Sequence, residues 1–443
     1  MRRSTSRPHV LPSLSPQSWL PLALLLAGCP GSSTVPSVDS GGSGLPGDAG
    51  PRTDDQRPPT ELDARGADRG SPVDGGGGGT FPVRYETSGI ALVSQAPITV
   101  SGVTLNTAFY RNTRYRCGKQ GHFTFLVVEL ASVTGQKKPL WVLMHGGGVG
   151  YYEKGGKYVG GEAANLEEGA TELRGVLEQH VGPAGTKKTI AAGRLKAGYR
   201  FLMPSMCDHD LYGGMGNVYP NNPNGTPPDT VDGLRATMAA IDFTARGSGA
   251  LKGYPTSQIF LHGTSAGSAG AYIVAHAFER GGVRLNGALL DAYLVSARTE
   301  DLFGTGCTPQ EKGAVNDGTT FSFKAVIDKI GPFVGDKSLF AERTVGSTGH
   351  VPLFDLVGQG DVHCCGQSPV VPAAKAAGAT NNCRYVHELL AQAMDKRPAS
   401  EHLAHLVVDS NAHVLTPSEG THQTALQAWL DAILATNPPA PWP

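Results

Sequence analysis

A serine between glycines is the clearest chemical feature of this chain. The stretch Gly263-Thr264-Ser265-Ala266-Gly267 follows the apolar run Ile259-Phe260-Leu261 and precedes an alanine-rich stretch that is typical of a helix. A serine on a sharp strand-to-helix turn exposes its hydroxyl, and the turn leaves no room for side chains two residues away on either side. The pattern predicts Ser265 as a nucleophile. Its alternative is a glycine-rich β–α turn without chemistry.

A second glycine cluster could stabilise the charge that such a nucleophile creates. His145-Gly146-Gly147-Gly148 comes directly after the apolar run 139–144. Attack of a serine on an acyl carbon produces an oxyanion, which needs backbone N–H groups aimed at it beforehand. Consecutive glycines let the chain turn those groups inward. We expect one donor from Gly146 or Gly147 and the other from Ala266; a flexible turn is the alternative.

A serine nucleophile on this kind of turn is followed in the chain by its acid and then by its base. Asp361 comes at the end of the strand-like run 351–360, and Asp291 follows Leu289 and Leu290. We prefer Asp361, because the penultimate strand usually supplies the acid when the turn is of this type. Asp291 stays as the alternative.

Two histidines near the C-terminus are candidates for the base. His413 lies a few residues beyond the strand-like run 405–409, so its loop should reach the edge of the sheet where Ser265 is expected. His422 comes after Pro417 and Gly420 at the start of the last helix, where we expect a solvated or helix-capping side chain. We therefore prefer His413, with His422 as the alternative.

The elements that must hold these residues alternate between strands and helices. Short apolar runs predict buried strands, and residues 81–131 predict an antiparallel start to the sheet. The closing helix carries an apolar stripe that repeats with helical spacing: Leu426, Trp429, Leu430, Ile433 and Leu434. This alternation predicts an α/β fold with a mostly parallel central sheet and helices on both faces. The stretches 151–198 and 296–349 are expected to be cap insertions.

The N-terminus has the pattern of a segment for export and lipid attachment. Arg2, Arg3 and Arg7 precede the short apolar run 20–27, which ends in Leu26-Ala27-Gly28-Cys29 like a bacterial lipobox. We expect a signal peptide over 1–28, lipid attachment at Cys29, a Gly/Ser/Pro/Asp-rich tether over 29–80 and one catalytic domain over 81–443. The predicted location is a bacterial membrane facing the periplasm or the cell surface, and a signal without lipid is the alternative.

The remaining six cysteines are interpreted as disulfides, because an exported protein meets an oxidising compartment. Sequence alone does not choose among their pairings. The neighbours Cys364 and Cys365 are expected to bond different partners, since a ring between adjacent cysteines is strained. Metal sites at Asp361–Cys365 and at Cys207–Asp210 are the alternative, because zinc prefers thiolates. We expect no metal and no cofactor.

The overall composition is that of a globular protein without a polyanionic partner. Hydrophobic residues make up 40% of the chain, charged residues 17%, and the formal net charge is −1. A charge balance so close to neutral gives no support for nucleic-acid binding. The expected partners are an ester substrate and, through the lipid alone, a membrane.

Taken together, these stretches resemble the α/β-hydrolase superfamily and, more narrowly, the pectin acetylesterase/Notum family of carboxylesterases. The narrower resemblance is carried by five stretches, namely 141–148, 203–210, 263–267, Asp361 and 410–413. His145 stands where that family usually has an acidic residue, and the Trp-Cys pair after the glycines is absent. The resemblance implies an α/β-hydrolase fold with Ser265, Asp361 and His413 as a triad, and possible O-acetyl polysaccharide substrates.

These features predict ester hydrolysis through an acyl-enzyme. Two alternatives stay open at this point. One is a catalytically inactive hydrolase fold that acts as a surface binding protein, and the other is a peptidase or polyester depolymerase on the same fold.

Overall fold

A computed structural model of the chain describes most of the predicted catalytic domain. The described residues are 86–100, 103–116, 121–133, 135–147, 150–152, 158–160, 167–182, 186–206, 210–214, 217–218, 230–247, 258–296, 298–303, 341, 345 and 351–436. The predicted signal peptide, the tether and Cys29 lie outside them. None of the helices within these ranges has both the length and the apolar character that crossing a bilayer requires.

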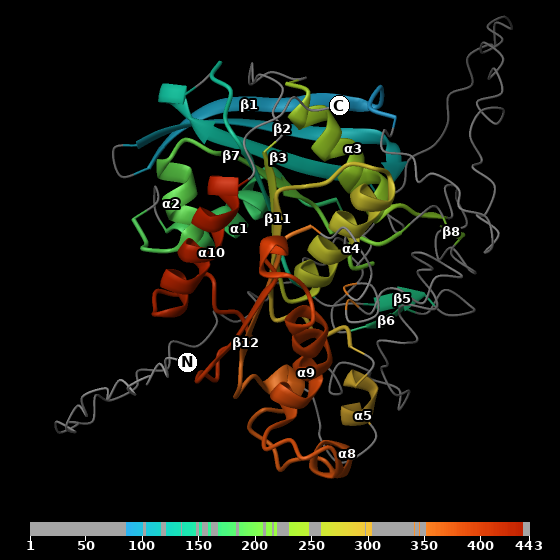
Figure 1. Cartoon of the computed structure of the whole chain (residues 1–443). Helices are drawn as coiled ribbons and strands as arrows, with labels where there is room; N and C mark the ends of the chain where they lie inside the picture. The colour runs from blue at the N-terminus through green and yellow to red at the C-terminus, as the bar shows by residue number, and fades with distance from the viewer. Residues whose placement is uncertain are drawn as a thin grey trace, which may run out of the picture. The chain divides into compact units, whose positions relative to one another are not determined.

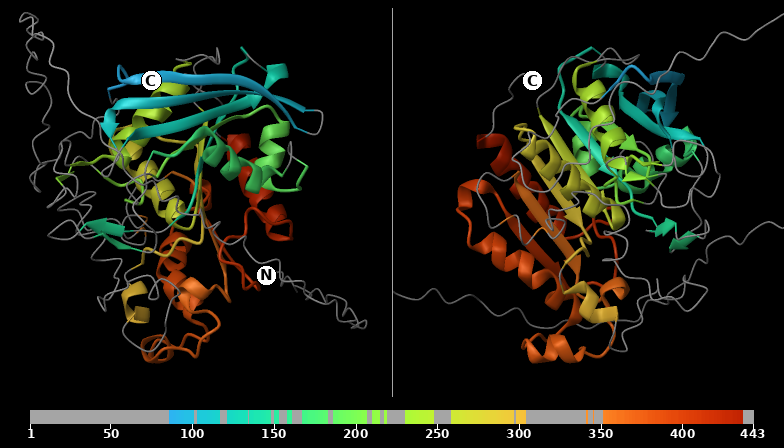
Figure 2. Two further views of the ribbon diagram at one scale, coloured as in Figure 1. Left: turned by 180° about the vertical axis from the view of Figure 1, so that it is seen from behind. Right: turned by 90° about the vertical axis from the view of Figure 1, so that its right-hand side faces the viewer.

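A nine-stranded sheet forms the centre of the fold, in the order β1-β2-β3-β7-β4-β10-β11-β12-β13. Its strands are β1 (Ile90–Val100), β2 (Val103–Arg116), β3 (His122–Leu130), β4 (Leu140–Met144), β7 (Arg200–Pro204), β10 (Ile259–Thr264), β11 (Gly287–Asp291), β12 (Leu353–Gly358) and β13 (Ala404–Val408). The strands β7, β4, β10, β11, β12 and β13 pair in parallel. The strands β1 to β3 form an antiparallel meander, which joins the parallel strands through β3 and β7. Figure 2 shows the parallel strands side by side in its right-hand view.

Each face of the sheet is covered by its own set of helices. Helices α1 (Ala170–Val181), α2 (Ile190–Lys196) and α10 (His422–Thr436) share one apolar core with the sheet. Helices α3 (Gly233–Ala245), α4 (Ala266–Arg280) and α9 (Asn382–Asp395) share the other. Figure 1 shows the two sets on opposite sides of the strands. The central strands are buried on both faces, which explains why their sequences are continuously apolar rather than alternating.

The strand order and the turn after β10 define the α/β-hydrolase fold, as predicted. The one interchange in the parallel part places β7 outside β4, so that β4 and β10 are neighbours. The sharp turn that carries Ser265 joins β10 directly to α4. The antiparallel start is present, and the runs 139–144, 259–261, 351–360 and 405–409 each correspond to a strand whose ends are shifted by a few residues.

The prediction of a cap insertion over 151–198 is wrong for its second half. Leu173 and Leu177 of α1 and Ile190 and Leu195 of α2 are almost fully buried, in the same apolar core as Trp141 of the sheet. Their amphipathic spacing therefore builds a covering layer and not a lid. Nearly all of the predicted insertion 296–349 lies outside the described residues.

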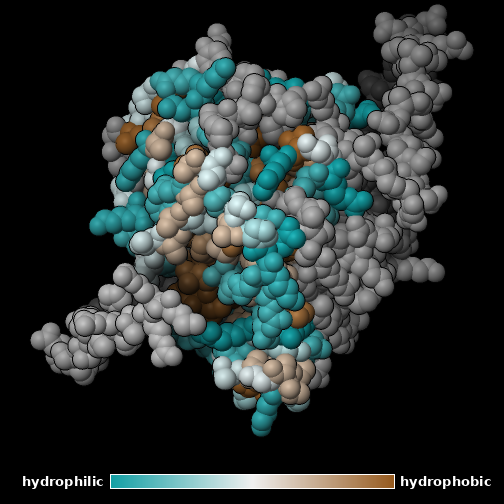
Figure 3. Space-filling view, in the orientation of Figure 1, coloured by the Kyte–Doolittle hydropathy of each residue, from teal (hydrophilic) through white to brown (hydrophobic). Residues whose placement is uncertain are grey.

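The described surface carries polar and apolar side chains side by side. Figure 3 shows hydrophilic groups with smaller apolar patches between them on the described part of one face. Among the described residues, Leu92 and Val93 on the edge strand β1 are the large apolar side chains that stand out as exposed. The apolar groups of the chain are thus largely enclosed in the two cores on either side of the sheet.

Candidate active site

The candidate residues gather at one edge of the sheet, where its parallel strands end. Ser265 follows β10, His145 follows β4, and Asp291 is the last residue of β11. Asp361 and His413 follow β12 and β13 within a few residues. In open α/β sheets the carboxyl ends of the strands are where ligands bind, because the loops there converge.

Ser265 has a strained backbone that the local sequence makes possible. Its φ is 53° and its ψ is −122°, a conformation that side-chain-bearing residues rarely adopt. A Cβ on Gly263 would lie 1.9 Å from the carbonyl oxygen of Gly267, and one on Gly267 would lie 2.1 Å from the carbonyl oxygen of Met144. Only glycine fits at either position, so the two glycines let α4 start tightly against β10 and β4.

Three side chains meet in a continuous hydrogen-bonded row. The Ser265 hydroxyl lies 2.7 Å from Nε2 of His413, and Nδ1 of His413 lies 2.8 Å from a carboxylate oxygen of Asp361. Because a carboxylate only accepts, Nδ1 carries the ring proton and Nε2 is free to accept from the hydroxyl. The Asp361 side chain is fully buried, and that of His413 is 20% exposed. The structure therefore brings together the three residues preferred from the sequence.

Asp361 is held by the turn that it starts. It precedes the short 3-10 helix η4 (Val362–Cys364), and its second carboxylate oxygen accepts the backbone N–H of His363 at 2.8 Å. Cys364 forms a disulfide with Cys383 of α9, with 5.0 Å between their Cα atoms. Cys365 is disulfide-bonded as well, so the neighbouring cysteines bond different partners, as expected. The alternative of a thiolate metal site at Asp361–Cys365 is therefore excluded, because these sulfurs are oxidised.

The acid loop and the histidine loop fit closely against each other. A Cβ on Gly360 would lie 1.9 Å from the side-chain oxygen of Asn411, and one on Gly358 would lie 2.5 Å from the carbonyl oxygen of Ala412. The Gly360 backbone N–H also donates to the carbonyl of Ser410 at 2.9 Å. These contacts fix the distance between Asp361 and His413 through the backbone and not through the two side chains alone.

The predicted oxyanion donors border the nucleophile. A Cβ on Gly146 would lie 2.7 Å from Cβ of Ser265, so the backbone of Gly146 passes directly beside the serine. Ala266 is the first residue of α4, and the first N–H groups of a helix have no partner within it. Gly147 is also described, whereas Gly148 lies outside the described residues.

His145 connects the glycine loop to Glu168, a residue that sequence reasoning missed. Its Nδ1 donates to the carbonyl of Gly146 at 2.7 Å, and its Nε2 lies 3.2 Å from a Glu168 carboxylate oxygen. The same oxygen accepts the backbone N–H of Met206 at 3.1 Å. In a trans peptide the carbonyl and the following N–H point in opposite directions, so this bond turns the N–H of Gly147 away from the His145 ring. Nothing in the sequence around Glu168 signals this role.

Asp291, the alternative acid, bonds to the histidine loop but not to the His413 ring. Its carboxylate accepts the backbone N–H groups of Leu415 and Thr416 and the hydroxyl of Thr416, at 2.7–3.1 Å. Its own carbonyl accepts the backbone N–H of Ser265 at 2.8 Å. Burial raises the pKa of Asp291 to about 6, against the lowering effect of those hydrogen bonds. Asp291 thus ties the histidine loop to the nucleophile.

A buried chain of hydrogen bonds extends from Asp291 beneath the site. The Thr416 hydroxyl donates to Asp291, so Nε2–H of His262 donates to Thr416 at 2.8 Å, and Trp141 donates to Nδ1 of His262 at 3.2 Å. Burial holds the pKa of His262 well below its usual value and lowers that of its neighbour His180 to about 3. Both rings are therefore neutral. Sequence reasoning missed this chain because its members come from four separate parts of the sequence.

The expectation that His422 is solvated is wrong. It is 5% exposed, and its Nε2 donates to the carbonyl of Leu415 at 3.0 Å. Asp210 belongs to the stretch Cys207–Asp210, the second alternative metal site. It is 1% exposed and accepts the backbone N–H groups of Gly214 and Gly233, and burial raises its pKa to about 6. Cys207, Asp208 and His209 lie outside the described residues.

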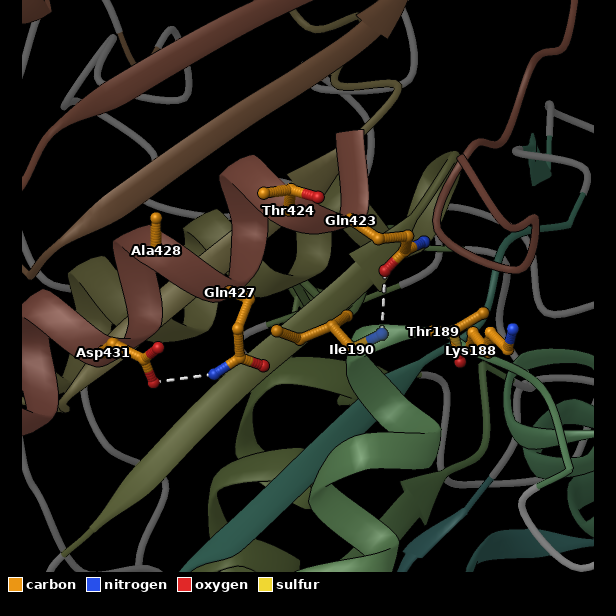
Figure 4. A pocket seen from close by; sticks show the side chains of 8 residues that line it. All are labelled: Lys188, Thr189, Ile190, Gln423, Thr424, Gln427, Ala428 and Asp431. Carbon is orange, nitrogen blue, oxygen red and sulfur yellow. Dashed lines mark hydrogen bonds between the residues drawn. The ribbon is translucent and has the colours of Figure 1, made fainter. Parts of the chain in front are cut away.

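A cavity of about 440 Å³ lies between α2 and α10, away from the triad side chains. Figure 4 shows its lining: Lys188, Thr189, Ile190, Gln423, Thr424, Gln427, Ala428 and Asp431. Gln423 bridges its walls by accepting the backbone N–H of Ile190 at 2.8 Å. None of the lining residues belongs to the row of Ser265, His413 and Asp361. This cavity is therefore separate from the candidate active site.

Comparisons with known proteins give distant similarity only. No protein-family model and no curated protein sequence matches the chain. Among solved structures, it is similar to an esterase of Rhizomucor miehei (13% identity, 80% of this chain and 88% of that one, TM-score 0.40). It is also similar to an S-formylglutathione hydrolase of Agrobacterium tumefaciens (10%, 77% and 99%, TM-score 0.45) and to esterase B of Lactobacillus rhamnosis (13%, 76% and 87%, TM-score 0.41). These identities and TM-scores do not identify the substrate of this chain.

Proposed function

We propose that this protein is a serine hydrolase that cleaves carboxylic esters through an acyl-enzyme on Ser265. The observation that carries the proposal is the row from the Ser265 hydroxyl through His413 to Asp361, with contacts of 2.7 and 2.8 Å. It stands on a strained serine turn beside a glycine loop, which is the arrangement that acyl transfer needs.

Each step of the reaction is assigned to a described group. Nε2 of His413 takes the proton of Ser265 as the hydroxyl attacks the acyl carbon, and Asp361 stabilises the imidazolium that forms. The backbone N–H groups of Ala266 and of Gly146 or Gly147 donate hydrogen bonds to the developing oxyanion. His413 then gives its proton to the departing alcohol, and a water activated by the same ring releases the acid.

The test compares Ser265→Ala with Ser132→Ala, a control at an exposed serine on the 3-10 helix η1 (Ala131–Val133). Ser265→Ala should lose fluorophosphonate labelling and at least about 10³-fold in p-nitrophenyl ester turnover, since the nucleophile is essential. Ser132→Ala should keep both. Retention of a tenth of the turnover by Ser265→Ala would exclude the assignment. Labelling without ester turnover would point to another acyl substrate, such as a peptide.

The substrate and the location are proposed from the sequence. The resemblance to pectin acetylesterases supports O-acetyl groups on a polysaccharide as the substrate, and release of acetate from acetylated pectin or xylan tests it. The lipobox at 26–29 supports export and lipid anchoring at Cys29. In a lipoprotein-processing host, Cys29→Ser should move the protein from the membrane fraction to the soluble fraction, and an unchanged distribution would argue for an ordinary signal.

A further inference from the structure

A second histidine, His363, lies against the candidate base without a role in the proposed reaction. The centroids of the His363 and His413 rings are 3.9 Å apart, and their planes are tilted by 44°. Asp361 bonds to both residues, to the ring of His413 and to the backbone N–H of His363. Two imidazoles and one buried carboxylate thus share one small volume at the mouth of the site.

We propose that Asp361, His363 and His413 bind a divalent cation of the zinc type, and that the bound ion inhibits the enzyme by taking His413 from Ser265. One ligand atom of each residue lies within 4.8 Å of the other two. Zinc bonds to nitrogen and oxygen are about 2.0–2.2 Å long, so neighbouring ligand atoms stand about 3–4 Å apart. Movement of the His413 ring has to close this difference. The inhibition rests on the proposed function, whereas the binding does not.

The donor atoms determine which ions fit. Imidazole nitrogens suit Zn²⁺, Cu²⁺ and Ni²⁺, whereas Mg²⁺ and Ca²⁺ prefer sites made of oxygen atoms. The sulfur of Cys364 takes no part, because it is bonded to Cys383. The site therefore differs from the thiolate cluster that the sequence of this segment indicates, and it requires a residue 52 positions away from Asp361.

Two of the three ligands are already fixed by the fold. Asp361 starts η4 and His363 lies within it, and the Cys364–Cys383 disulfide fastens this turn to α9. The Asp361 carboxylate is fully buried, so water competes weakly for it. Binding of an ion therefore costs little conformational entropy at these two residues. His413 is the ligand that has to move.

Binding and catalysis exclude each other, because both nitrogens of His413 are in use. Nε2 faces the Ser265 hydroxyl and Nδ1 faces Asp361. An ion that takes Nε2 occupies the lone pair needed to accept the serine proton. An ion that takes Nδ1 displaces its proton and breaks the bond to Asp361. Either arrangement removes the base, and removal of the ion by a chelator restores it.

Calorimetric titration with Zn²⁺ tests the binding directly. The Ser265→Ala protein should bind one Zn²⁺ per chain and show no comparable binding of Mg²⁺. Adding His363→Gln, which keeps the η4 turn, should weaken binding by at least about tenfold, as loss of even an outer partner does at metal sites. His405→Ala is the control, because His405 is a partly exposed histidine on β13 that pairs with Asp395. Equal affinity in the His363→Gln protein would overturn the site.

Ester hydrolysis tests the inhibition. Zn²⁺ should inhibit the chelator-treated wild type reversibly. His363→Gln should need at least about tenfold more Zn²⁺ for half-inhibition, measured relative to its own activity without the ion. Binding without inhibition would overturn the inhibitory role and leave the site. A protein without any hydrolase activity would contradict the proposed function instead, while the titration would still decide whether the ion binds.

Discussion

Two carboxylates at the ends of neighbouring strands, β11 and β12, serve the same histidine loop in different ways. Asp361 contacts the His413 ring and fixes its tautomer, whereas Asp291 contacts the backbone of Leu415 and Thr416, two and three residues further on. Both are buried and both follow apolar strands in the sequence. The comparison shows that a carboxylate at the end of such a strand lies near the site. Whether it acts as the catalytic acid or supports the histidine loop depends on the group to which it hydrogen-bonds.

The sharpest way to break this comparison is Asp361→Asn. An amide there can hydrogen-bond to His413 but favours the wrong ring tautomer and cannot stabilise an imidazolium. We expect kcat to fall by about 10⁴-fold with little change in the melting temperature, as in other triads of this kind. Ester turnover and thermal unfolding, measured on the same preparation, check it. A loss of less than tenfold would mean that Asp291 or another group supports the base.

Asp291→Asn should have a smaller effect, of a different kind. The amide keeps one acceptor oxygen but places an NH₂ group against the N–H donors of Leu415 and Thr416, so the loop that carries His413 shifts. Misplacement of a catalytic group by about 1 Å costs up to about 10²-fold in rate. We expect a loss of about 10- to 100-fold in kcat, together with lower stability. Activity equal to the wild type would show that the loop is held without Asp291.

Asp291 should also make the stability of the protein depend on pH. The pKa of Asp291 is raised to about 6 by burial, so between pH 4 and 6 the unfolded chain releases a proton that the folded protein keeps. Its contribution to the unfolding free energy therefore falls as the pH rises through this window, by roughly 1 kcal/mol per pH unit. Asp291→Asn should lack this slope, and urea unfolding at several pH values measures the difference.

The wild-type curve alone would hide that slope. The buried neutral rings of His180 and His262 have lowered pKa values, so their contribution is present above the unfolded pKa of about 6.5 and is lost as the pH falls. The histidines and Asp291 thus act in opposite directions below pH 6. A difference between wild type and Asp291→Asn that stays constant from pH 4 to 6 would contradict the raised pKa.

The smallest expected effect on catalysis is that of His422→Ala. His422 holds the carbonyl of Leu415, on the same segment whose N–H groups Asp291 holds. Removing a buried hydrogen-bonding ring should cost about 1–3 kcal/mol of stability and change kcat/KM by less than about tenfold. His413→Ala, by contrast, should be nearly inactive. Steady-state kinetics of both variants provide the check, and the reverse ranking would move the base to His422.

The sequence by itself determined the parts of the protein that depend on near neighbours. The Ser265 turn is a local structure, because the residues that make it possible, Gly263 and Gly267, lie two positions away on either side. The apolar runs of the strands and the stripe on α10 depend on burial and helical spacing, which each segment carries within itself. For the same reason the α/β-hydrolase fold could be predicted, with a mostly parallel sheet and helices on both faces.

Only the tertiary structure decided how the loops meet. Ser265 and His413 are 148 residues apart. The sequence favours His413 over His422 and Asp361 over Asp291 only through their expected places after the last strands, and the hydrogen bonds that join them depend on the fold. The roles of Glu168 and Thr416, the covering position of α1 and α2 and the Cys364–Cys383 disulfide have the same origin. The first two and the disulfide depend on how loops pack at the sheet edge, and the position of α1 and α2 depends on apolar packing against a face of the sheet. Such distances are set by the whole fold rather than by any one segment of it.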